Sequence, residues 1–288
     1  MNNIRITVLI ILSIIASFLI ATLRVYEFGS LLLSSSIGFT LYFLLTISFL
    51  KIPQFKLSAL KIILAIVTGL FLIQIPARIY DFSGTLSTLP DFLLHFLGII
   101  CGFFYWSLKK PFNILAVFLS VSIVAFVSFK GYGLWSHKLN YGTFTGKVLY
   151  DLPVKFAAFD DNKNLILDDD FHNKIVLLDF WNTRCGICFE KFPQLQNVYE
   201  KYRDDKSIVI FAVNKPIEED KPNQAFDMIR EQQFSFPVVI TKDEDLAEKW
   251  GVKGYPTTFV INQTGQIVYK GDIEGAIEMV DELKLNSR

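Results

Sequence analysis

Two cysteines separated by two residues follow directly on an apolar run. The segment reads Val176-Leu-Leu-Asp-Phe-Trp181, then Asn-Thr-Arg-Cys185-Gly-Ile-Cys188. A strand that ends here and passes into a helix would carry Cys185 at the first turn, where free N–H groups and the helix dipole stabilise a thiolate. Two thiols at this spacing can close to a disulfide and reopen. The motif therefore predicts dithiol–disulfide exchange, with Cys185 as the attacking thiol and Cys188 as the thiol that resolves the mixed disulfide.

A zinc site is the alternative interpretation of a C-x-x-C motif. Zinc in such a site needs two further ligands. The chain offers Cys101, His95, His137 and His172, and none of them stands at ligand spacing. The sequence therefore favours redox chemistry, with no metal and no cofactor.

The first half of the chain has the composition of a membrane protein. Overall hydrophobic content is 52%, and five apolar stretches have about the length that a helix needs to cross roughly 30 Å of hydrocarbon. They cover residues 6–23, 31–50, 62–79, 92–108 and 112–129. The third is the weakest, because Gln74, Pro76 and Arg78 interrupt its end. We expect a bundle of about five spans over residues 1–130, including an uncleaved first span.

Charge separates the two halves of the chain. Residues 1–136 hold nine Lys/Arg and three Asp/Glu, a net of +6, whereas residues 137–288 hold nineteen and twenty-five, a net of −6. Neither half has a basic stripe with interleaved aromatic residues, so nucleic acid is not an expected partner. The lipid bilayer is an expected partner.

Positive charges in the short loops predict the orientation of the bundle. If the N-terminus is inside, the inner segments carry Arg5, Lys51, Lys56, Lys61, Lys109 and Lys110, and the outer loops carry only Arg24 and Arg78. Lys and Arg favour the cytoplasmic side of a membrane. Five crossings then deliver everything after Lys130 to the outside of the cytoplasmic membrane. If the third span fails to cross, the same segment is cytoplasmic.

The spans offer two side chains that could do chemistry, His95 and Cys101. An ionisable group inside a membrane is a candidate for function, but a hydrogen bond between helices is the simpler interpretation of His95. Cys101 is alone, and a thiol carrier within the bilayer needs a pair. Electrons are therefore expected to come from a separate protein.

The elements that must position the cysteines follow in the second half. Residues 131–150 are rich in Gly, Tyr and Thr and are expected to form a linker. The predicted elements of residues 151–288 are, in order, a hairpin (152–159 with 165–167), a buried strand (174–181), a helix (186–202), a strand (207–213), an insertion (214–234) with a helix near 223–233, a strand (237–241), a short helix (246–250), a hairpin (257–262 with 266–270) and a closing helix (274–285). Strand–helix–strand implies a parallel pair with a right-handed crossover.

With its two motifs, Cys185-Gly-Ile-Cys188 and Gly254-Tyr-Pro256-Thr, this order resembles the thioredoxin superfamily. The hairpin, the insertion and the membrane tether resemble its membrane-anchored TlpA/ResA branch over roughly residues 145–288. The expected fold is a helical membrane bundle followed by an α/β thioredoxin-fold domain with an N-terminal hairpin and a mid-fold insertion.

The resemblance implies roles for several residues. Asp179, six residues before Cys185, matches the buried acid that takes the proton of the second cysteine in thioredoxins. Pro256 matches the cis-proline that faces the active-site disulfide. Tyr255, Ile187 and Trp181 are the candidates for substrate contact, although Trp181 is expected to pack beneath the site.

One departure from the TlpA/ResA pattern concerns the acid that follows the second cysteine. The branch usually has Glu three residues after that cysteine, and here that position is Lys191. Glu190 and Lys191 are therefore expected to form a solvated or partner-facing pair. Asp179 is then the residue expected to take the proton of the second cysteine.

The sequence thus predicts an outward-facing thiol:disulfide oxidoreductase that acts on thiols or disulfides of envelope proteins as a reductant or isomerase. Two hypotheses of other classes remain. One is a binding module whose disulfide is only structural. The other is a thiol peroxidase, which would need Thr three residues before its cysteine, where this chain has Asn182.

Overall fold

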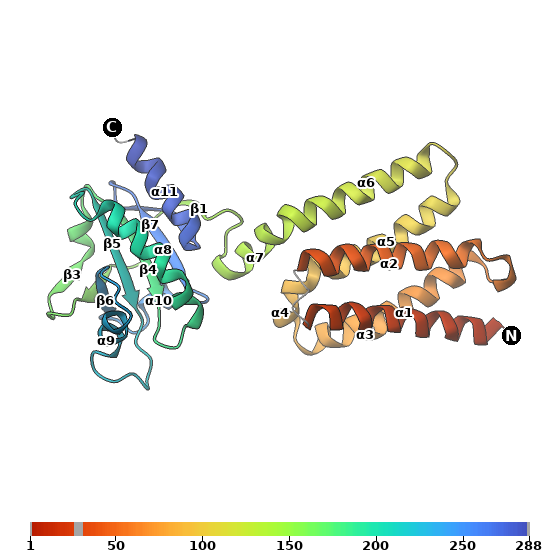
Figure 1. Cartoon of the computed structure of the whole chain (residues 1–288), viewed down its shortest axis with the longest axis horizontal. Helices are drawn as coiled ribbons and strands as arrows, with labels where there is room; N and C mark the ends of the chain where they lie inside the picture. The colour runs from red at the N-terminus through yellow and green to blue at the C-terminus, as the bar shows by residue number, and fades with distance from the viewer. Residues whose placement is uncertain (1, 26–30, 287–288) are drawn as a thin grey trace. The chain divides into compact units, whose positions relative to one another are not determined.

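The computed structural model describes residues 2–25 and 31–286, which divide into a helical unit up to Ser136 and an α/β unit from His137 onward. Figure 1 labels most of the helices and strands of both. The helical unit contains α1 (Asn2–Val25), α2 (Leu31–Lys51), η1 (Pro53–Phe55), α3 (Ala59–Tyr80), α4 (Phe82–Thr85), η2 (Leu86–Thr88), α5 (Leu89–Ser107), α6 (Phe112–Phe126), η3 (Val127–Gly131) and the first half of α7 (Tyr132–Tyr141). Five stretches of these helices are long and apolar enough to cross a membrane, as the sequence predicted.

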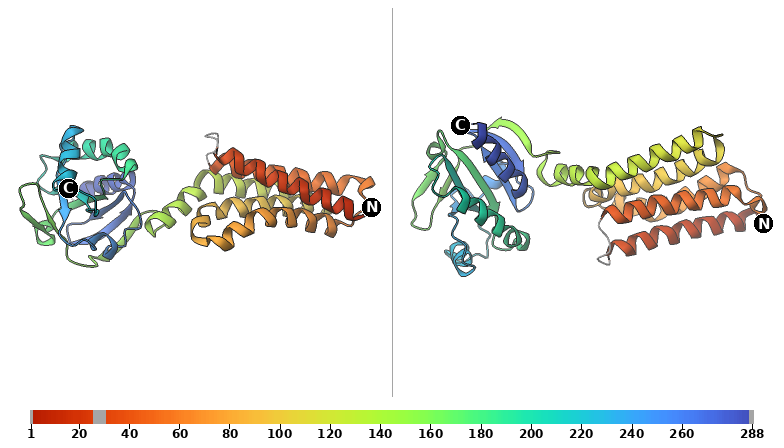
Figure 2. Two further views of the ribbon diagram at one scale, coloured as in Figure 1. Left: turned by 90° about the horizontal axis from the view of Figure 1, so that it is seen from below. Right: turned by 45° about the horizontal axis from the view of Figure 1, so that its top comes forward.

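The long helices pack in pairs, α1 against α3 and α2 against α5, and run side by side in Figure 2. Their shared core is aliphatic, with Leu9, Ile66 and Ile99 fully or almost fully buried. Pro90 stands in the first turn of α5, where its missing N–H has no helical acceptor in any case.

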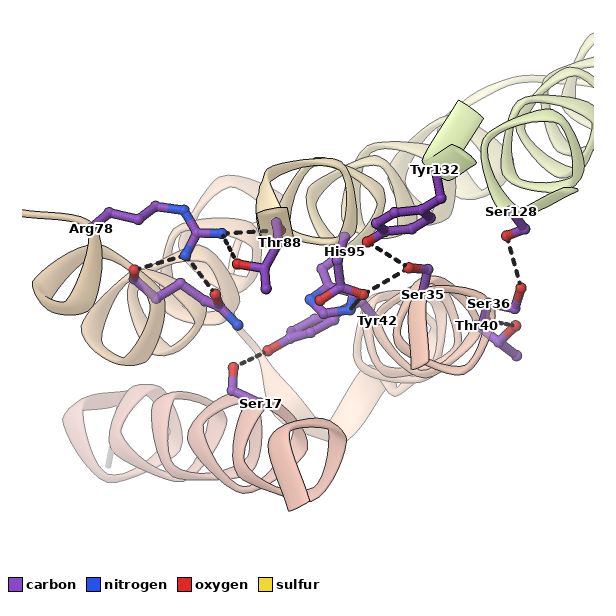
Figure 3. Close-up of polar contacts among 12 residues, drawn as sticks. Ser17, Ser35, Ser36, Thr40, Tyr42, Arg78, Thr88, His95, Ser128 and Tyr132 are labelled. Atoms are coloured by element: carbon purple, nitrogen blue, oxygen red, sulfur yellow. Dashed lines mark hydrogen bonds and ion pairs between the residues drawn. The ribbon is translucent and has the colours of Figure 1, made fainter. Parts of the chain in front are cut away.

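A buried polar cluster joins α2, α5 and α7 inside this unit (Figure 3). Ser35 Oγ donates to Asp91 Oδ1 at 2.9 Å and contacts the Tyr132 hydroxyl at 3.1 Å. His95 Nε2 lies 3.3 Å from the same carboxylate oxygen, and Asp91 and His95 are both fully buried. His95, which the sequence left as a candidate, therefore pairs with the acid one turn earlier in its own helix. Such pairs satisfy polar atoms that lipid cannot.

Glycines let α5 approach α2 closely. A Cβ built on Gly98 would lie 2.4 Å from the backbone oxygen of Phe39, and one on Gly38 would lie 1.9 Å from His95 Nε2. Small residues at helix contacts are the usual device for close packing between membrane helices.

The α/β unit is built on one eight-stranded sheet in the order β1-β8-β7-β4-β5-β6-β2-β3. The strands are β1 (Lys147–Asp151), β2 (Ala157–Phe159), β3 (Leu165–Leu167), β4 (Ile175–Trp181), β5 (Ile208–Asn214), β6 (Val238–Thr241), β7 (Thr257–Ile261) and β8 (Gln266–Gly271). Strand β4 is central: it pairs in parallel with β5 and antiparallel with β7, and every one of its residues is buried. This explains its unbroken apolar sequence.

Helices cover both faces of the sheet. They are η4 (Asp168–Phe171), α8 (Gly186–Tyr202), α9 (Gln224–Glu231), α10 (Leu246–Lys249) and α11 (Ile273–Asn286). Alternate residues of β4 belong to two separate cores: Leu177 and Trp181 pack with α8 and α11, whereas Leu178 and Phe180 pack against the α10 side. The domain is thus the expected thioredoxin-like α/β fold.

The segment from 131 to 150 differs from the expected linker. It holds the end of η3, all of α7 and most of β1, which pairs antiparallel with β8 at one edge of the sheet. The N-terminal hairpin is present as β2 and β3, and β2 joins the opposite edge by pairing with β6. The Gly and Thr content of 142–146 marks only the turn between α7 and β1, where Gly142 and Gly146 have positive φ.

The close contact at Gly98 gives a test of the helical packing. We expect Gly98→Ala to destabilise the bundle by roughly 1–3 kcal/mol, because the new methyl group meets backbone that cannot rotate away. The measurement is thermal unfolding of the detergent-purified full chain. Gly133→Ala is the matched control, since a Cβ there meets nothing within 4 Å. Equal melting temperatures for the two variants would contradict the α2–α5 contact.

Candidate active site

The cysteine pair lies at the start of α8, immediately after the central strand. Cys185 is the N-cap residue, and its Sγ accepts a hydrogen bond from the Cys188 backbone N–H at 3.2 Å. The two sulfurs form a disulfide, with Cα atoms 5.3 Å apart. A sulfur at this point faces the free N–H groups of the first helical turn. The same position would stabilise the thiolate of Cys185 after reduction.

Accessibility distinguishes the two cysteines. Cys188 is fully buried, Cys185 is half-buried, and the side chain of Ile187 between them is 59% exposed. An incoming sulfur can therefore approach Cys185 and not Cys188. The roles predicted for the pair require this difference in accessibility.

Asp179 lies inside the sheet on the same face as the cysteines. It is only 1% exposed. It shares one face of β4 with Leu177 and Trp181, which pack in one cluster with Cys188. Its Oδ1 accepts a hydrogen bond of 2.7 Å from Thr258, its partner on β7. Burial is the main cause that raises the pKa of Asp179 to about 7, against a smaller lowering effect of the Thr258 bond. A carboxyl with this pKa can accept and return a proton near neutral pH.

A second carboxylate acts on Asp179 from the last helix. Glu274 in the first turn of α11 adds to the rise in the pKa of Asp179, because two negative charges repel. Glu274 is itself paired with Lys191 of α8, and that contact helps to hold its own pKa low. Glu190 and Lys191, expected as a solvated or partner-facing pair, both reach solvent, and Lys191 binds across to α11. No local sequence pattern signals Glu274, since the contact joins residues 83 positions apart.

The Tyr255–Pro256 peptide bond is cis, as the resemblance implied. Tyr255 is half-buried and packs at the edge of both cores of the domain.

Trp181 is placed differently from the prediction of substrate contact. It is fully buried and packs edge-on against Phe189 and Phe192 at ring distances of 5.7 and 5.2 Å. Its ring therefore supports the floor of the site and cannot touch a substrate.

Arg184, the residue before Cys185, pairs with an acid of the insertion. Its guanidinium lies 3.4 Å from Glu219 of the insertion, and both side chains are more than half exposed. An exposed ion pair of this kind contributes about 0–1 kcal/mol to stability.

No group of three or more His, Cys, Asp or Glu side chains suited to a metal ion occurs within residues 2–25 and 31–286.

Comparison with known proteins agrees with this geometry. Residues 150–270 match the AhpC/TSA family. The chain is 26% identical over 172 residues to the thiol-disulfide oxidoreductase ResA of Bacillus thuringiensis, covering 59% of this chain and 92% of that protein. It is 33% identical over 113 residues to ResA of Bacillus subtilis, covering 39% of this chain and 61% of that protein. The α/β domain is thus a ResA/TlpA-like thiol–disulfide oxidoreductase domain of the thioredoxin superfamily.

Among solved structures, StoA from Bacillus subtilis aligns with a TM-score of 0.39 and 22% identity, over 45% of this chain and 98% of that one. The match to the AhpC/TSA family begins at residue 150, so it leaves out the five apolar helices and α7. The chain is therefore an oxidoreductase whose helical half fits a membrane anchor and has no counterpart in that match.

The proton affinity of Asp179 leads to a prediction about pH. In the parent, the rate at which the mixed disulfide resolves should rise with pH through about 7 as Asp179 ionises. Asp179→Asn should lose this inflection and react about 10²-fold more slowly at neutral pH, because the proton acceptor is gone. The measurement is stopped-flow release of a fluorescent thiol between pH 5.5 and 8.5, with the exposed carboxylate variant Asp227→Asn as control. Superimposable profiles for parent and Asp179→Asn would remove Asp179 from the mechanism.

Stability provides a second readout of the same substitution. The folded domain holds the Asp179 proton up to about pH 7, while an unfolded chain releases it near 3.8. Unfolding free energy in the parent should therefore fall as pH rises between these values, by at most roughly 4 kcal/mol. Asp179→Asn should remove that loss, and so exceed the parent in stability above pH 7 and match it below pH 4.

Proposed function

We propose that this chain is a membrane-anchored, outward-facing oxidoreductase that reduces or isomerises disulfides of envelope proteins. The observation that carries the proposal is the pairing of a partly exposed Cys185 with a buried Cys188, on the same face of the sheet as the buried acid Asp179. A disulfide that serves only structure needs neither an accessible sulfur nor a proton acceptor beneath it.

The reaction needs two transfers of a sulfur–sulfur bond. In the reduced enzyme, the Cys185 thiolate attacks one sulfur of the substrate disulfide, and the other substrate sulfur leaves as a thiolate. The Cys188 thiol then gives its proton to the Asp179 carboxylate, and its thiolate attacks Cys185. The Cys185–Cys188 disulfide forms, the second substrate sulfur leaves, and two electrons have passed to the substrate.

Regeneration of the dithiol requires an outside donor. The only other cysteine is Cys101, which is buried in α5 of the helical unit. One thiol cannot deliver the two electrons of a dithiol pair. We infer that a separate protein with its own dithiol reduces the disulfide by the same exchange, docking at Cys185.

The loop charges of the helical unit support the outward orientation. Lys51, Lys56 and Lys61 flank the turn between α2 and α3, and Arg5 of α1 donates to the Phe55 backbone oxygen of the same turn at 3.0 Å. Lys109 and Lys110 fill the turn between α5 and α6. These ends carry the positive charges that face the cytoplasm in most membrane proteins. The chain after the fifth helix then continues on the opposite side.

The two cysteines should behave differently when they are replaced. Cys185→Ser should abolish reduction of insulin disulfides, whereas Cys188→Ser should accumulate mixed disulfides with partner proteins, because the resolving thiol is absent. The readouts are turbidity with insulin and non-reducing gels of cell extracts. Trapping by Cys185→Ser instead would reverse the assigned roles. Turnover of a hydroperoxide faster than of insulin would favour a peroxidase, and turnover of neither would favour a binding module.

Orientation is tested separately with reporter fusions. Alkaline phosphatase matures only outside the cytoplasm, so a fusion after Arg288 should be active. A fusion after Lys56, in the turn between α2 and α3, is the matched control and should be inactive. A well-expressed but inactive fusion at Arg288 would mean an even number of crossings and a cytoplasmic domain.

A further inference from the structure

The turn that precedes the attacking cysteine carries a buried hydroxyl group. Residues 182–185 form this turn between β4 and α8, and Thr183 within it is only 7% exposed. Its Oγ1 donates a hydrogen bond to Oδ1 of Asp220, an acid of the insertion that stands 37 positions along the chain. The bond therefore joins the residue two places before Cys185 to a side chain that lies outside both sequence motifs.

The insertion holds the Asp220 carboxylate in a fixed place. Its second oxygen, Oδ2, accepts from the Ile217 backbone N–H at 3.0 Å, and the Asp220 backbone N–H donates to the Ile217 oxygen at 3.0 Å. The same segment is joined to the end of β4, because the Lys215 N–H donates to the Trp181 oxygen at 2.9 Å. With both oxygens bound, the carboxylate is a fixed acceptor for Thr183.

The other contacts of the turn are local or exposed. The Cys185 N–H donates to the Asn182 backbone oxygen at 3.1 Å, and the Arg184 N–H donates to the Asn182 side-chain oxygen at 3.0 Å. These bonds shape the turn from within. The Arg184–Glu219 ion pair also reaches the insertion, but both of its side chains are more than half exposed, so it contributes little. The buried Thr183–Asp220 bond is thus the stronger side-chain link between the turn and the insertion.

The place of this turn matters because of the sulfur at its end. Cys185 is the N-cap residue of α8, and its sulfur accepts from the N–H of Cys188. Stabilisation of negative charge by a helix end falls off within the first turn. A turn that is free to shift would therefore carry the sulfur out of the region where its thiolate is favoured.

We propose that Thr183 and Asp220 are positioning residues for Cys185, and that the bond between them keeps the reduced sulfur at the free N–H groups of α8. The inference rests on the proposed role of Cys185 as the attacking thiol, and it adds the insertion to the parts of the domain that this role needs. Without the bond the thiolate loses part of its stabilisation, so a higher pH is needed to form it.

The test follows alkylation of Cys185 by iodoacetamide in the reduced full chain in detergent, from pH 5 to 9, by mass spectrometry of the peptide that contains it. Thr183→Val keeps the shape of the side chain and removes the hydroxyl. Below the midpoint pH of the parent, this variant should react about 2- to 5-fold more slowly. At high pH, where every thiol is ionised, it should match the parent. Thr183→Ser keeps the hydroxyl and should react like the parent throughout.

Thr264→Val is the matched control for the loss of a hydroxyl. Thr264 Oγ1 donates to Asn262 Oδ1 at 2.7 Å in the turn between β7 and β8, so this substitution removes a similar bond elsewhere in the domain. It should leave the alkylation profile of Cys185 unaltered. Identical profiles for Thr183→Val and Thr264→Val would overturn the positioning role, and so would a rate that falls equally at every pH.

A double substitution identifies the partner of Thr183. In an Asp220→Ala background, Thr183→Val should have almost no further effect, because the acceptor is already gone. Comparison within one background cancels the change of charge. An equal effect of Thr183→Val in both backgrounds would overturn the pairing.

Substitutions of Asp220 alone cover the case in which Thr183→Val does not fold, since Asp220 is partly exposed. Asp220→Asn and Asp220→Ala both remove the charge, but only asparagine keeps an oxygen that can accept from Thr183. Below the midpoint pH, Asp220→Ala should react about 2- to 5-fold more slowly than Asp220→Asn. Equal rates would contradict the role of Asp220.

The same samples separate this inference from the function on which it rests. A parent whose Cys188 is alkylated in preference to Cys185, or that fails to reduce insulin, would overturn the proposed function. A parent that passes both tests, with a Cys185 profile that Thr183→Val does not change, would overturn the positioning role alone.

Discussion

The burial of one carboxyl group, that of Asp179, is the constraint on which the rest of the site depends. A carboxylate placed in the middle of a fully buried strand is costly, and here a single hydrogen bond from Thr258 compensates it only in part. The group responds by holding its proton to about pH 7. The domain thus gives up stability at neutral pH by keeping a carboxyl on the face of β4 that packs with Cys188, and we propose this carboxyl as the proton acceptor.

The surrounding elements are arranged around that acid. Thr258 faces it because β7 runs antiparallel to β4 in a register that sets residues 179 and 258 opposite each other. The first turns of α8 and α11 both pack on the same face, and they bring the Lys191–Glu274 pair with them. Lys191 offsets the charge of Glu274, so the acid from α11 stays ionised without driving the pKa of Asp179 much higher. The position that the TlpA/ResA branch usually gives to an acid is therefore used here for the counter-ion of another acid.

The helical half follows different physical rules from the α/β half. Its apolar residues face both the interior and the outside, so burial of apolar area cannot by itself select one packing. Close contacts at glycines and the buried cluster of Ser35, Asp91 and His95 supply that selection. In the sheet, the alternation of side chains between the two faces of β4 selects the packing. One face packs on α8 and α11, and the other packs on the α10 side.

Local signals in the sequence were sufficient to predict much of the fold and of the candidate site. The apolar spans, the order of strands and helices, the cysteines at a helix start, the acid six residues earlier and the proline of the Gly-Tyr-Pro motif all lie within short segments. Their physics is local as well, because span length, strand burial and helix capping depend on near neighbours.

What only the tertiary structure decided depends on contacts between distant residues. The Lys191–Glu274 pair joins residues 83 positions apart, and no periodicity could have paired them. Trp181 was a candidate for substrate contact until the packing of α8 buried it completely. The segment 131–150 has the composition of a linker, yet Gly271 on a strand far along the chain leaves room for His137, and residues from His137 onward fold with the α/β unit. Shape complementarity of this kind exists only after the chain has folded, because each partner is created by the placement of the other.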